Sequence, residues 1–293
     1  MNNTTFIESY KEYLNSKNLS VNTISSYVYD VISFDEYLYN NYKINIVQTK
    51  KAQILTYLVD MQKHGKSSST ISRSISSLKN FFEYLKKNKS VSDNPALSIH
   101  SPKQIKKVPV ILSEEQITEL MSIPNTNTFK GSRDSAILEL LYSSGIKVTE
   151  LISLKIVDVN LNAGIINVEG TKERILPLSD ISKNAIMNYI NNFRDIKSKE
   201  SNKFLFINAN GENISRQGIW KILKYYETIL QNTKELSPQI LRNSFAVHLL
   251  THGADLRTVQ ELMGLTSIAA TQNYLNSIEI KSLEVFKKTF PRV

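Results

Sequence analysis

Apolar side chains recur every three or four residues through the first hundred positions, which is the spacing that puts them on one face of a helix. Ser20 or Asn22 can cap the second of these stretches, and Gly65 ends the third. The pattern predicts an all-helical N-terminal domain of four helices over residues 1–92. Its apolar stripes are Phe6, Tyr10, Tyr13 and Leu14; Ile24, Tyr27, Val28, Val31, Ile32 and Leu38; Ile54, Leu55, Leu58 and Met61; and Ile71, Ile75, Leu78, Phe82 and Leu85.

The fourth predicted helix has a polar face made of small hydroxyls and two cations. Hydroxyls and cations can donate hydrogen bonds to phosphates, so Arg73 and Lys79 are candidate DNA contacts. Taken alone, the pattern favours an ordinary solvated helix face over a phosphate-binding one. The face comprises Ser67, Ser68, Ser69, Ser72, Arg73, Ser76 and Lys79.

Residues 93–110 interrupt the helical pattern with three prolines and predict an extended linker between two domains. The segment reads DNPALSIHSPKQIKKVPV. Its cations Lys103, Lys106 and Lys107 can lie along a phosphate backbone, or they can simply keep the linker solvated.

Residues 111–293 predict a second, mostly helical domain that contains a small sheet. Ser113 and Gln116 form a capping-box pattern before a helix. A further helix stops near Gly145, and another begins near Lys147. Two segments predict β-structure, namely the hairpin GIINVEGTKERILPL and the short strand KFLFIN, which is followed by a turn at NANGENIS. Four or five helices then complete the chain, with Asp255, Ser267 and Ser277 as candidate starts.

The composition is that of an ordinary globular protein, with 41% hydrophobic and 22% charged residues. There is no cysteine, which excludes disulfides and thiolate metal sites and fits a reducing cytoplasm. No apolar run approaches the roughly 18 residues of a membrane span. The N-terminal sequence MNNTTFIESYKEYL lacks the apolar core of a signal peptide. We therefore expect a cytoplasmic protein.

The net charge of +9 is unevenly distributed along the chain. Residues 1–107 hold 15 Lys and Arg against 8 Asp and Glu, whereas the remainder holds 21 against 19. A basic block concentrated in one segment indicates a polyanion such as nucleic acid, although a solubilising surface explains the charge equally well. No strongly basic amphipathic helix with aromatic anchors indicates a membrane surface.

Common catalytic signatures, including phosphate-binding glycine loops and zinc-binding HExxH, do not occur. His248 and His252 have the spacing of metal ligands on a helix, but the sequence offers no third ligand nearby. They are interpreted as ordinary helix residues, and no metal is expected.

One constellation of segments remains, and it resembles the tyrosine recombinases, in particular the Xer-type chromosomal recombinases. The resemblance covers nearly the whole chain, through LSVNTISSYVYDVISFDEYL, YSSGIKVTELISL, GTKERILPL, SRQGIWK, SPQILRNSFAVHLLTHGADLRTVQELMGL and TQNY in that order. It implies a mainly α, two-domain clamp that closes on double-stranded DNA and acts as a tetramer. It also implies exchange of a C-terminal helix between neighbours, for which IEIKSLEVFKKTF is the candidate, although this segment could equally pack within its own chain.

The chemistry of such enzymes needs a protein hydroxyl that attacks a phosphodiester, together with fixed cations near the non-bridging oxygens. Arginine suits this role because its planar fork donates two parallel hydrogen bonds, and a lysine can protonate the leaving oxygen. The phosphotyrosine conserves the bond energy for rejoining, so no cofactor and no metal are required.

The resemblance assigns roles to individual residues. Tyr274, in TQNYL, matches the nucleophile, and Arg242 matches the second active-site arginine. Lys172 is the best match to the catalytic lysine, although the family's turn usually reads GKGxKER and is longer than the turn here. Glu150 matches an acidic residue that supports the site.

Three positions depart from the family pattern. Lys147 stands in place of the first arginine and loses the bidentate fork. Gln239 replaces a histidine and cannot shuttle a proton, and Leu265 replaces a histidine or tryptophan and donates nothing. Loss of one such donor typically costs about 10²–10³ in rate.

Three hypotheses follow from this pattern. The first is a site-specific recombinase acting through a 3′-phosphotyrosine, and the second is a catalytically impaired paralogue that binds DNA as an architectural or regulatory partner. In either case the chain can associate with itself or pair with a second recombinase on DNA. The third is a helical interaction protein that no longer binds DNA. Only the first two predict a DNA affinity that falls steeply with salt.

Overall fold

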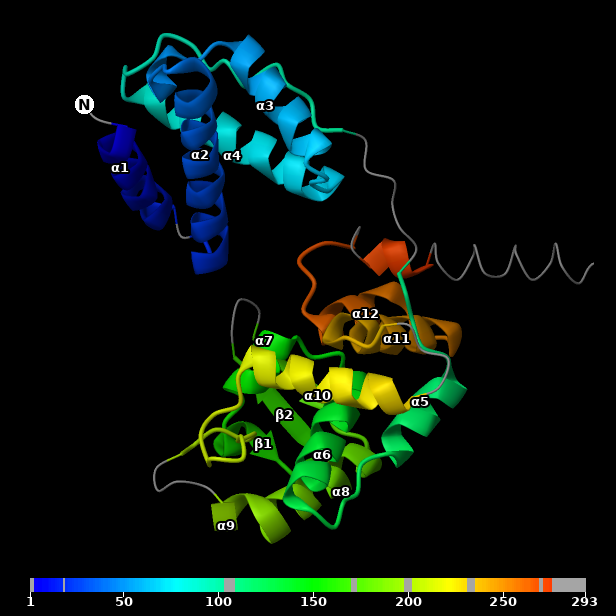
Figure 1. The fold of residues 1–293 in the computed structure, drawn as a ribbon. Coiled ribbons are helices and arrows are strands. Elements are labelled where there is room, and N and C mark those ends of the chain that lie inside the picture. The colour runs from blue at the N-terminus through cyan, green and yellow to red at the C-terminus, as the bar shows by residue number, and fades with distance from the viewer. Residues whose placement is uncertain are drawn as a thin grey trace, which may run out of the picture. The chain divides into compact units, whose positions relative to one another are not determined.

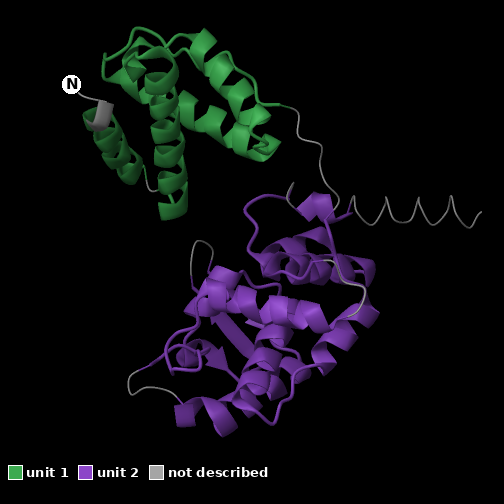
Figure 2. Cartoon of the chain, in the orientation of Figure 1, with its two compact units in different colours: residues 1–106 green, residues 107–293 purple. Residues whose placement is uncertain are grey.

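The computed structural model describes residues 3–17, 19–102, 109–169, 173–197, 202–230, 235–268 and 271–275. The chain forms two compact units, residues 1–106 and 107–293 (Figure 2). Both are built mainly from helices, and the second contains one small sheet (Figure 1). The predicted fold class is therefore confirmed.

The first unit carries the predicted helices α1 (Asn3–Ser16), α2 (Val21–Tyr42), α3 (Lys51–Lys63) and α4 (Ser68–Lys87). A short 3-10 helix, η1 (Ile46–Gln48), joins α2 to α3. The hydroxyls of Ser20 and Ser67 cap α2 and α4 by accepting from the amides of Thr23 and Thr70. Side chains from the predicted stripes fill the core, except Ile32 and Leu55, which are exposed.

A buried carboxylate joins α2 to α4. Asp30 is 3% exposed and accepts from Arg73 Nε and Nη2, at 3.0 and 2.9 Å, and from Ser77 Oγ at 2.7 Å. Three donors offset the cost of burying that charge. The guanidinium of Arg73 therefore has a structural partner, and its assignment as a DNA contact stays a prediction. Lys79 is half-buried on the same helix.

The second unit begins with α5 (Glu114–Ser122), α6 (Phe129–Ser144) and α7 (Val148–Ser153). The capping box of Ser113 and Gln116 is confirmed, because each side chain accepts from the other's amide. Gly145 ends α6 in the left-handed conformation. A 3-10 turn, η2 (Ile156–Asp158), leads into the sheet.

The sheet is antiparallel, in the order β1 (Val159–Asn160), β2 (Ile165–Val168) and β3 (Arg174–Pro177). The predicted hairpin is confirmed, with Val168 paired to Arg174 beside its turn. Lys172 lies in that turn, outside the described residues, as do Lys103, Lys106 and Lys107 of the predicted linker.

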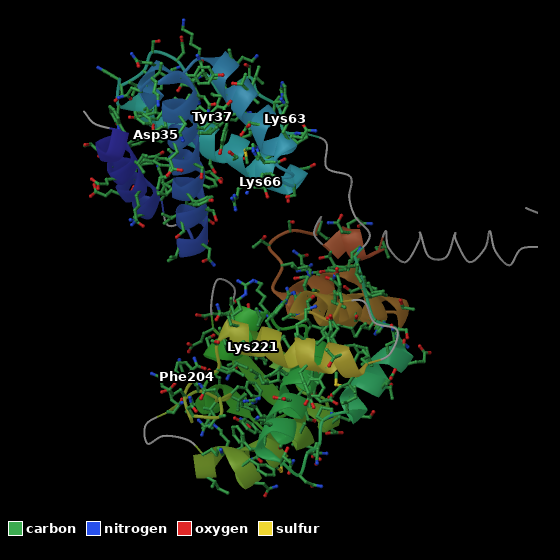
Figure 3. The ribbon with its side chains drawn as sticks, viewed as in Figure 1. Asp35, Tyr37, Lys63, Lys66, Phe204 and Lys221 are labelled. Carbon is green, nitrogen blue, oxygen red and sulfur yellow. The ribbon has the colours of Figure 1, made fainter. Side chains whose placement is uncertain are left out.

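The predicted strand KFLFIN is wrong. Its residues form only isolated bridges, from Phe204 (labelled in Figure 3) to Lys155 and from Ile207 to Asn213. The carbonyls of Phe204 and Leu205 instead accept from the guanidinium of Arg194. The apolar run reflects burial of Leu205, Phe206 and Ile207, which a short loop can achieve without a ladder.

The remaining helices are α8 (Asp180–Tyr189), which continues as a π-helical turn over Ile190–Arg194, then α9 (Asp195–Lys197), α10 (Arg216–Ile229), α11 (Pro238–Thr251) and α12 (Leu256–Met263). Residues 271–275 are also helical, whereas Ser277 and IEIKSLEVFKKTF lie outside the described residues. Asp255 caps α12 as predicted, accepting from the amides of Arg257 and Thr258.

The core of the second unit is centred on α6, which packs against α8 and α11. α12 packs against α11 and β3, and α7 packs against α10. These contacts gather the ends of α6, α7, α11 and α12 in one region. Nowhere in the described chain is a helix long and apolar enough to cross a membrane.

Candidate active site

A pocket of about 450 Å³ opens between the start of α7, the start of α10 and the start of α11. Three of the predicted site residues lie on its wall, namely Gln239 and Arg242 from α11 and Lys147, which is far from them in the sequence. The full lining is Ile146, Lys147, Val148, Arg216, Gln217, Trp220, Ser237, Pro238, Gln239 and Arg242.

Arg242 is 5% exposed and is held by backbone carbonyls. Its Nη1 donates to Gly145 O and its Nη2 to Met263 O, the latter at 2.5 Å. Burial lowers the pKa of Arg242, while nearby Tyr274 and Glu150 act in the opposite direction. A guanidinium has five N–H donors, so these two carbonyls orient the group and leave donors for a ligand in the pocket.

The contact between Arg242 and Gly145 depends on glycine. Gly145 has a φ of +57°, and a Cβ at that position would collide with the ring of Phe245. Both the left-handed conformation and the close approach therefore favour glycine. The end of α6 is thus shaped so that its carbonyl reaches the arginine.

Tyr274 is 8% exposed, and its hydroxyl donates to Asn243 Oδ1 at 3.2 Å. Gln239 Nε2 donates to the same oxygen at 2.7 Å, and Asn243 Nδ2 donates to Val110 O at 3.2 Å. Burial raises the pKa of Tyr274, although the charge of Arg242 and a hydrogen bond from Gln239 oppose that rise. The phenol is consequently neutral near pH 7, and it lies next to two predicted site residues.

Asn243 was not identified from the sequence. It matches no catalytic motif, and its only signal is that it lies four residues after Gln239 and therefore on the same helix face. Its amide joins Tyr274, Gln239 and the first residues of the second unit.

Glu150 lies between two cations beside the pocket. Arg174 forms a fork with it, Nη1 to Oε1 at 3.0 Å and Nη2 to Oε2 at 2.8 Å. The amide of Lys147 donates to Glu150 Oε2 at 2.9 Å, and Lys147 Nζ lies 3.7 Å from Oε1. Glu150 thus fixes the backbone of Lys147 while the lysine side chain stays 39% exposed at the pocket.

The pKa of Glu150 reflects opposing causes. Burial alone would raise it, but hydrogen bonds from Arg174 and from the amide of Lys147, together with the charges of both residues, lower it below its usual value. Glu150 is therefore an ionised, structurally engaged carboxylate at neutral pH.

Replacing Glu150 with glutamine is expected to lower the free energy of unfolding at pH 7 by about 2 kcal/mol, because hydrogen bonds to the charged carboxylate are lost. The pKa is lower in the folded protein than in the unfolded chain, so the carboxylate stabilises fully above about pH 4.3 and progressively less as the pH falls through the folded value. Urea unfolding of both proteins between about pH 7 and about pH 3 measures this. If the two free energies of unfolding differed by the same amount at every pH in that range, Glu150 would not be a stabilising ionised carboxylate.

Leu265 follows Gly264 at the end of α12 and is half-buried beside the apolar cluster of Phe245, Val259 and Met263. An aliphatic side chain there packs and cannot donate to a phosphate. Lys172, whose role also depends on its reach, lies outside the described residues.

A basic and aromatic surface adjoins the pocket on α10. Arg216 and Trp220 line the pocket, Lys221 is exposed on the same helix (Figure 3), and Lys224 lies over the Trp220 ring at 5.4 Å. Trp220, the single tryptophan of the sequence, is 54% exposed. The segment SRQGIWK is one of those that resemble the tyrosine recombinases, but the sequence alone assigned no role to its individual residues.

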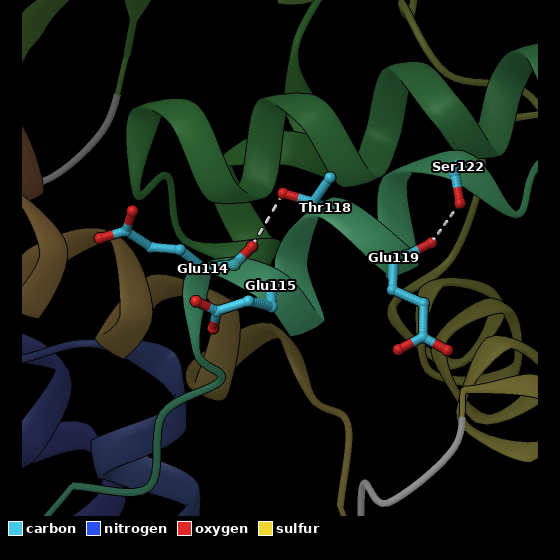
Figure 4. Close-up of a pocket in the computed structure, with 5 residues that line it drawn as sticks. All are labelled: Glu114, Glu115, Thr118, Glu119 and Ser122. Atoms are coloured by element: carbon cyan, nitrogen blue, oxygen red, sulfur yellow. Dashed lines mark hydrogen bonds between the residues drawn. The ribbon is translucent and has the colours of Figure 1, made fainter.

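A second pocket, on α5, has the opposite electrostatic character. Glu114, Glu115, Thr118, Glu119 and Ser122 line it (Figure 4). Three carboxylates would repel a phosphate, so this pocket does not compete as the reaction site.

The two predicted ordinary histidines have separate partners. His248 Nδ1 lies 3.0 Å from Tyr142 Oη, and His252 Nε2 lies 3.6 Å from Glu114. Within the described residues, no three His, Cys, Asp or Glu side chains are grouped so that they could hold a metal ion.

Comparison with known proteins identifies the family. Residues 111–279 match the model described as "Phage integrase family", and residues 7–89 match "Phage integrase, N-terminal SAM-like domain". A protein of Caldanaerobacter subterraneus subsp. tengcongensis is 43% identical over 98% of this chain and 97% of its own length. Tyrosine recombinase XerD of Oceanobacillus iheyensis is 38% identical over 98% of each chain. The chain belongs to the phage integrase family of tyrosine recombinases.

Solved structures show the same fold at lower identity. The XerH site-specific recombinase bound to a palindromic difH substrate superposes with a TM-score of 0.77 at 18% identity, covering 94% of this chain and 81% of that one. The Tn1549 transposon integrase bound to circular intermediate DNA superposes with a TM-score of 0.75 at 19% identity, covering 96% of this chain and 99% of that one.

Proposed function

We propose that this chain carries out site-specific DNA recombination, cleaving and rejoining strands through a covalent 3′-phosphotyrosine at Tyr274. The observation that carries the proposal is the convergence of Lys147, Gln239 and Arg242 on one pocket, with the Tyr274 hydroxyl bonded to the amide that Gln239 also contacts. Family membership and full-length relatives named tyrosine recombinase XerD support it.

In the cleavage step, the scissile phosphate occupies the pocket and the phenolic oxygen of Tyr274 attacks phosphorus. An O–P bond forms, the bond to the 5′-oxygen breaks, and the phenolic proton is lost to solvent. Arg242 donates to the non-bridging oxygens, Lys147 adds positive charge, and Gln239 supplies a neutral donor. Lys172 protonates the leaving 5′-oxygen. Rejoining is the reverse, with a 5′-hydroxyl attacking the phosphotyrosine.

DNA binding is assigned to both domains. Residues 1–92 form the core-binding domain, 93–110 the linker and 111–293 the catalytic domain. Arg73, Lys79 and the linker cations Lys103, Lys106 and Lys107 contact phosphates, and so does the exposed face of α10. Self-association, or pairing with a second recombinase on DNA, completes the assembly in the cytoplasm.

The alternative function, DNA binding without efficient cleavage, draws its support from the replaced residues Lys147, Gln239 and Leu265. The comparisons do not favour it, because they point to recombinases along the full length of the chain. A nicked suicide duplex separates the two functions. After attack the broken piece diffuses away, so a cleaving enzyme accumulates a denaturant-resistant adduct.

Restoring the family residues should speed cleavage. The triple substitution Lys147→Arg, Gln239→His and Leu265→His supplies a guanidinium fork and two imidazole donors, and we expect an adduct rate at least about tenfold higher than that of the wild type. Rates on the suicide duplex measure the effect. Lys155→Arg is a matched control, because Lys155 pairs with Glu169 outside the pocket. An unchanged rate in the triple variant would mean that these departures do not limit the reaction.

A further inference from the structure

Arg174 lies where three elements of the candidate site meet. It is the first residue of β3, and its guanidinium forks onto Glu150 of α7. Its Nε also donates to Leu262 O in the last turn of α12 at 2.7 Å. One side chain, 8% exposed, thus joins the hairpin to α7, whose start lines the pocket, and to α12, whose Met263 carbonyl accepts from Arg242.

The end of α12 is shaped around this guanidinium. Gly264 has a φ of +59°, and a Cβ there would lie 2.8 Å from Arg174 Nη1. Glycine at this left-handed position leaves the guanidinium its present place, because a Cβ would displace Nη1. The two carbonyls before Gly264 accept from two different arginines: Leu262 O accepts from Arg174 and Met263 O accepts from Arg242.

The network therefore links groups with separate roles. Glu150 fixes the backbone of Lys147, the turn of α12 holds Arg242, and β3 begins two residues after Lys172. A shift of the Arg174 guanidinium would move Glu150, the partner of Lys147, and the turn of α12 that holds Arg242. Displacements of about 1 Å in such groups can cost on the order of 10²-fold in rate.

A buried arginine with a purely structural role is available for comparison in the same unit. Arg133 is equally buried, pairs with Asp134 at 2.7 Å and donates to Ile207 O at 3.3 Å. Neither of these partners lines the pocket. The two arginines thus match in burial and in the type of their partners, but only the partners of Arg174 contact the candidate site.

We infer that Arg174 is a positioning residue for strand cleavage, which sets the relative placement of Lys147, Arg242 and the strand leading from Lys172. The inference rests on the proposed function for the identity of these three groups. Arg174 itself touches no substrate and acts through Glu150 and the last turn of α12.

The test compares Arg174→Lys with Arg133→Lys, because each keeps a positive charge and loses a guanidinium fork. Single-turnover adduct formation at saturating DNA should fall at least about 30-fold in Arg174→Lys and stay within about threefold of wild type in Arg133→Lys. DNA dissociation constants should stay within about threefold in both. Combining Arg174→Lys with Glu150→Gln should lower the rate little beyond Arg174→Lys alone, since both break one ion pair.

Hydrogen exchange gives a readout that does not require cleavage. Amides of residues 173–176 and 262–265 should exchange faster in Arg174→Lys than in the wild type, and Arg133→Lys should leave them unchanged. Equal rate losses in the two variants, or unchanged exchange at both segments, would overturn the positioning role. If the wild type forms no adduct, the proposed function fails, and the exchange measurement still decides whether Arg174 joins these segments.

Discussion

Replacing Tyr274 with phenylalanine is expected to abolish the denaturant-resistant adduct on a nicked suicide duplex while leaving duplex binding within about threefold. The substitution removes the attacking oxygen and keeps the ring, which belongs to the same apolar cluster as Phe245 and Val247. The lost hydrogen bond to Asn243 should cost only about 1 kcal/mol of stability. Gel separation of DNA-linked from free protein under denaturing conditions measures the effect.

Tyr226→Phe is the matched control for that experiment. Its hydroxyl is also buried and also donates over 3.2 Å, but to Asp134, away from the pocket. The control should keep a wild-type adduct rate. An adduct that persists in Tyr274→Phe would show that a side chain other than Tyr274 is the nucleophile.

Replacing Arg242 with lysine is expected to slow adduct formation by about 10³-fold, the largest rate effect among the cationic residues. Lysine keeps the charge but cannot reach two backbone carbonyls and still present a fork to a phosphate. The carbonyls of Gly145 and Met263 would also lose their donor, so some loss of stability should accompany the kinetic effect.

Arg194→Lys separates those two effects. Arg194 is 2% exposed and likewise donates to backbone carbonyls, those of Phe204 and Leu205. Its replacement should destabilise the fold to a similar degree and leave single-turnover cleavage by folded protein nearly unchanged. Comparable slowing in both variants would mean that Arg242 acts only as a structural arginine.

Much of the helical framework was predictable because its signals are local. The apolar spacing of α1 to α4, the hydroxyl of Ser20 and the capping box of Ser113 each depend on residues within one or two turns. Gly145 and Lys147 likewise marked the end of α6 and the start of α7. These features need no tertiary information.

The errors and omissions arise where tertiary contacts decide the conformation. KFLFIN has the composition of a strand. The carbonyls of Phe204 and Leu205, however, accept hydrogen bonds from Arg194 instead of from a neighbouring strand. Leu55 has helical spacing, but no element covers it, and it is 44% exposed. Strand β1 is only two residues long and has no periodicity to detect.

The candidate site was predicted by resemblance and could not be derived from spacing. Gln239 and Arg242 lie on α11 and Lys147 lies at the start of α7, and only the fold shows that the two helices share a pocket. The partners that orient them were missed for the same reason. Arg174 precedes Leu262 by 88 positions, and nothing in GTKERILPL indicates that its arginine reaches α12.

The departures at Lys147, Gln239 and Leu265 have different structural settings. Lys147 and Gln239 line the pocket and can still offer charge or a hydrogen bond, whereas Leu265 packs beside an apolar cluster. We therefore expect a slow enzyme in which Arg242 and Lys147 carry most of the stabilisation of the phosphate.

In the proposed reaction the phenolic oxygen of Tyr274 becomes joined to the 3′-phosphate of a cleaved strand. Mass spectrometry of the protease-digested adduct tests it most directly, because the nucleotide remains attached to one peptide. We expect a 3′-phosphonucleotide on the peptide that contains Tyr274. A nucleotide on any other residue, or a link through a 5′-phosphate, would contradict it.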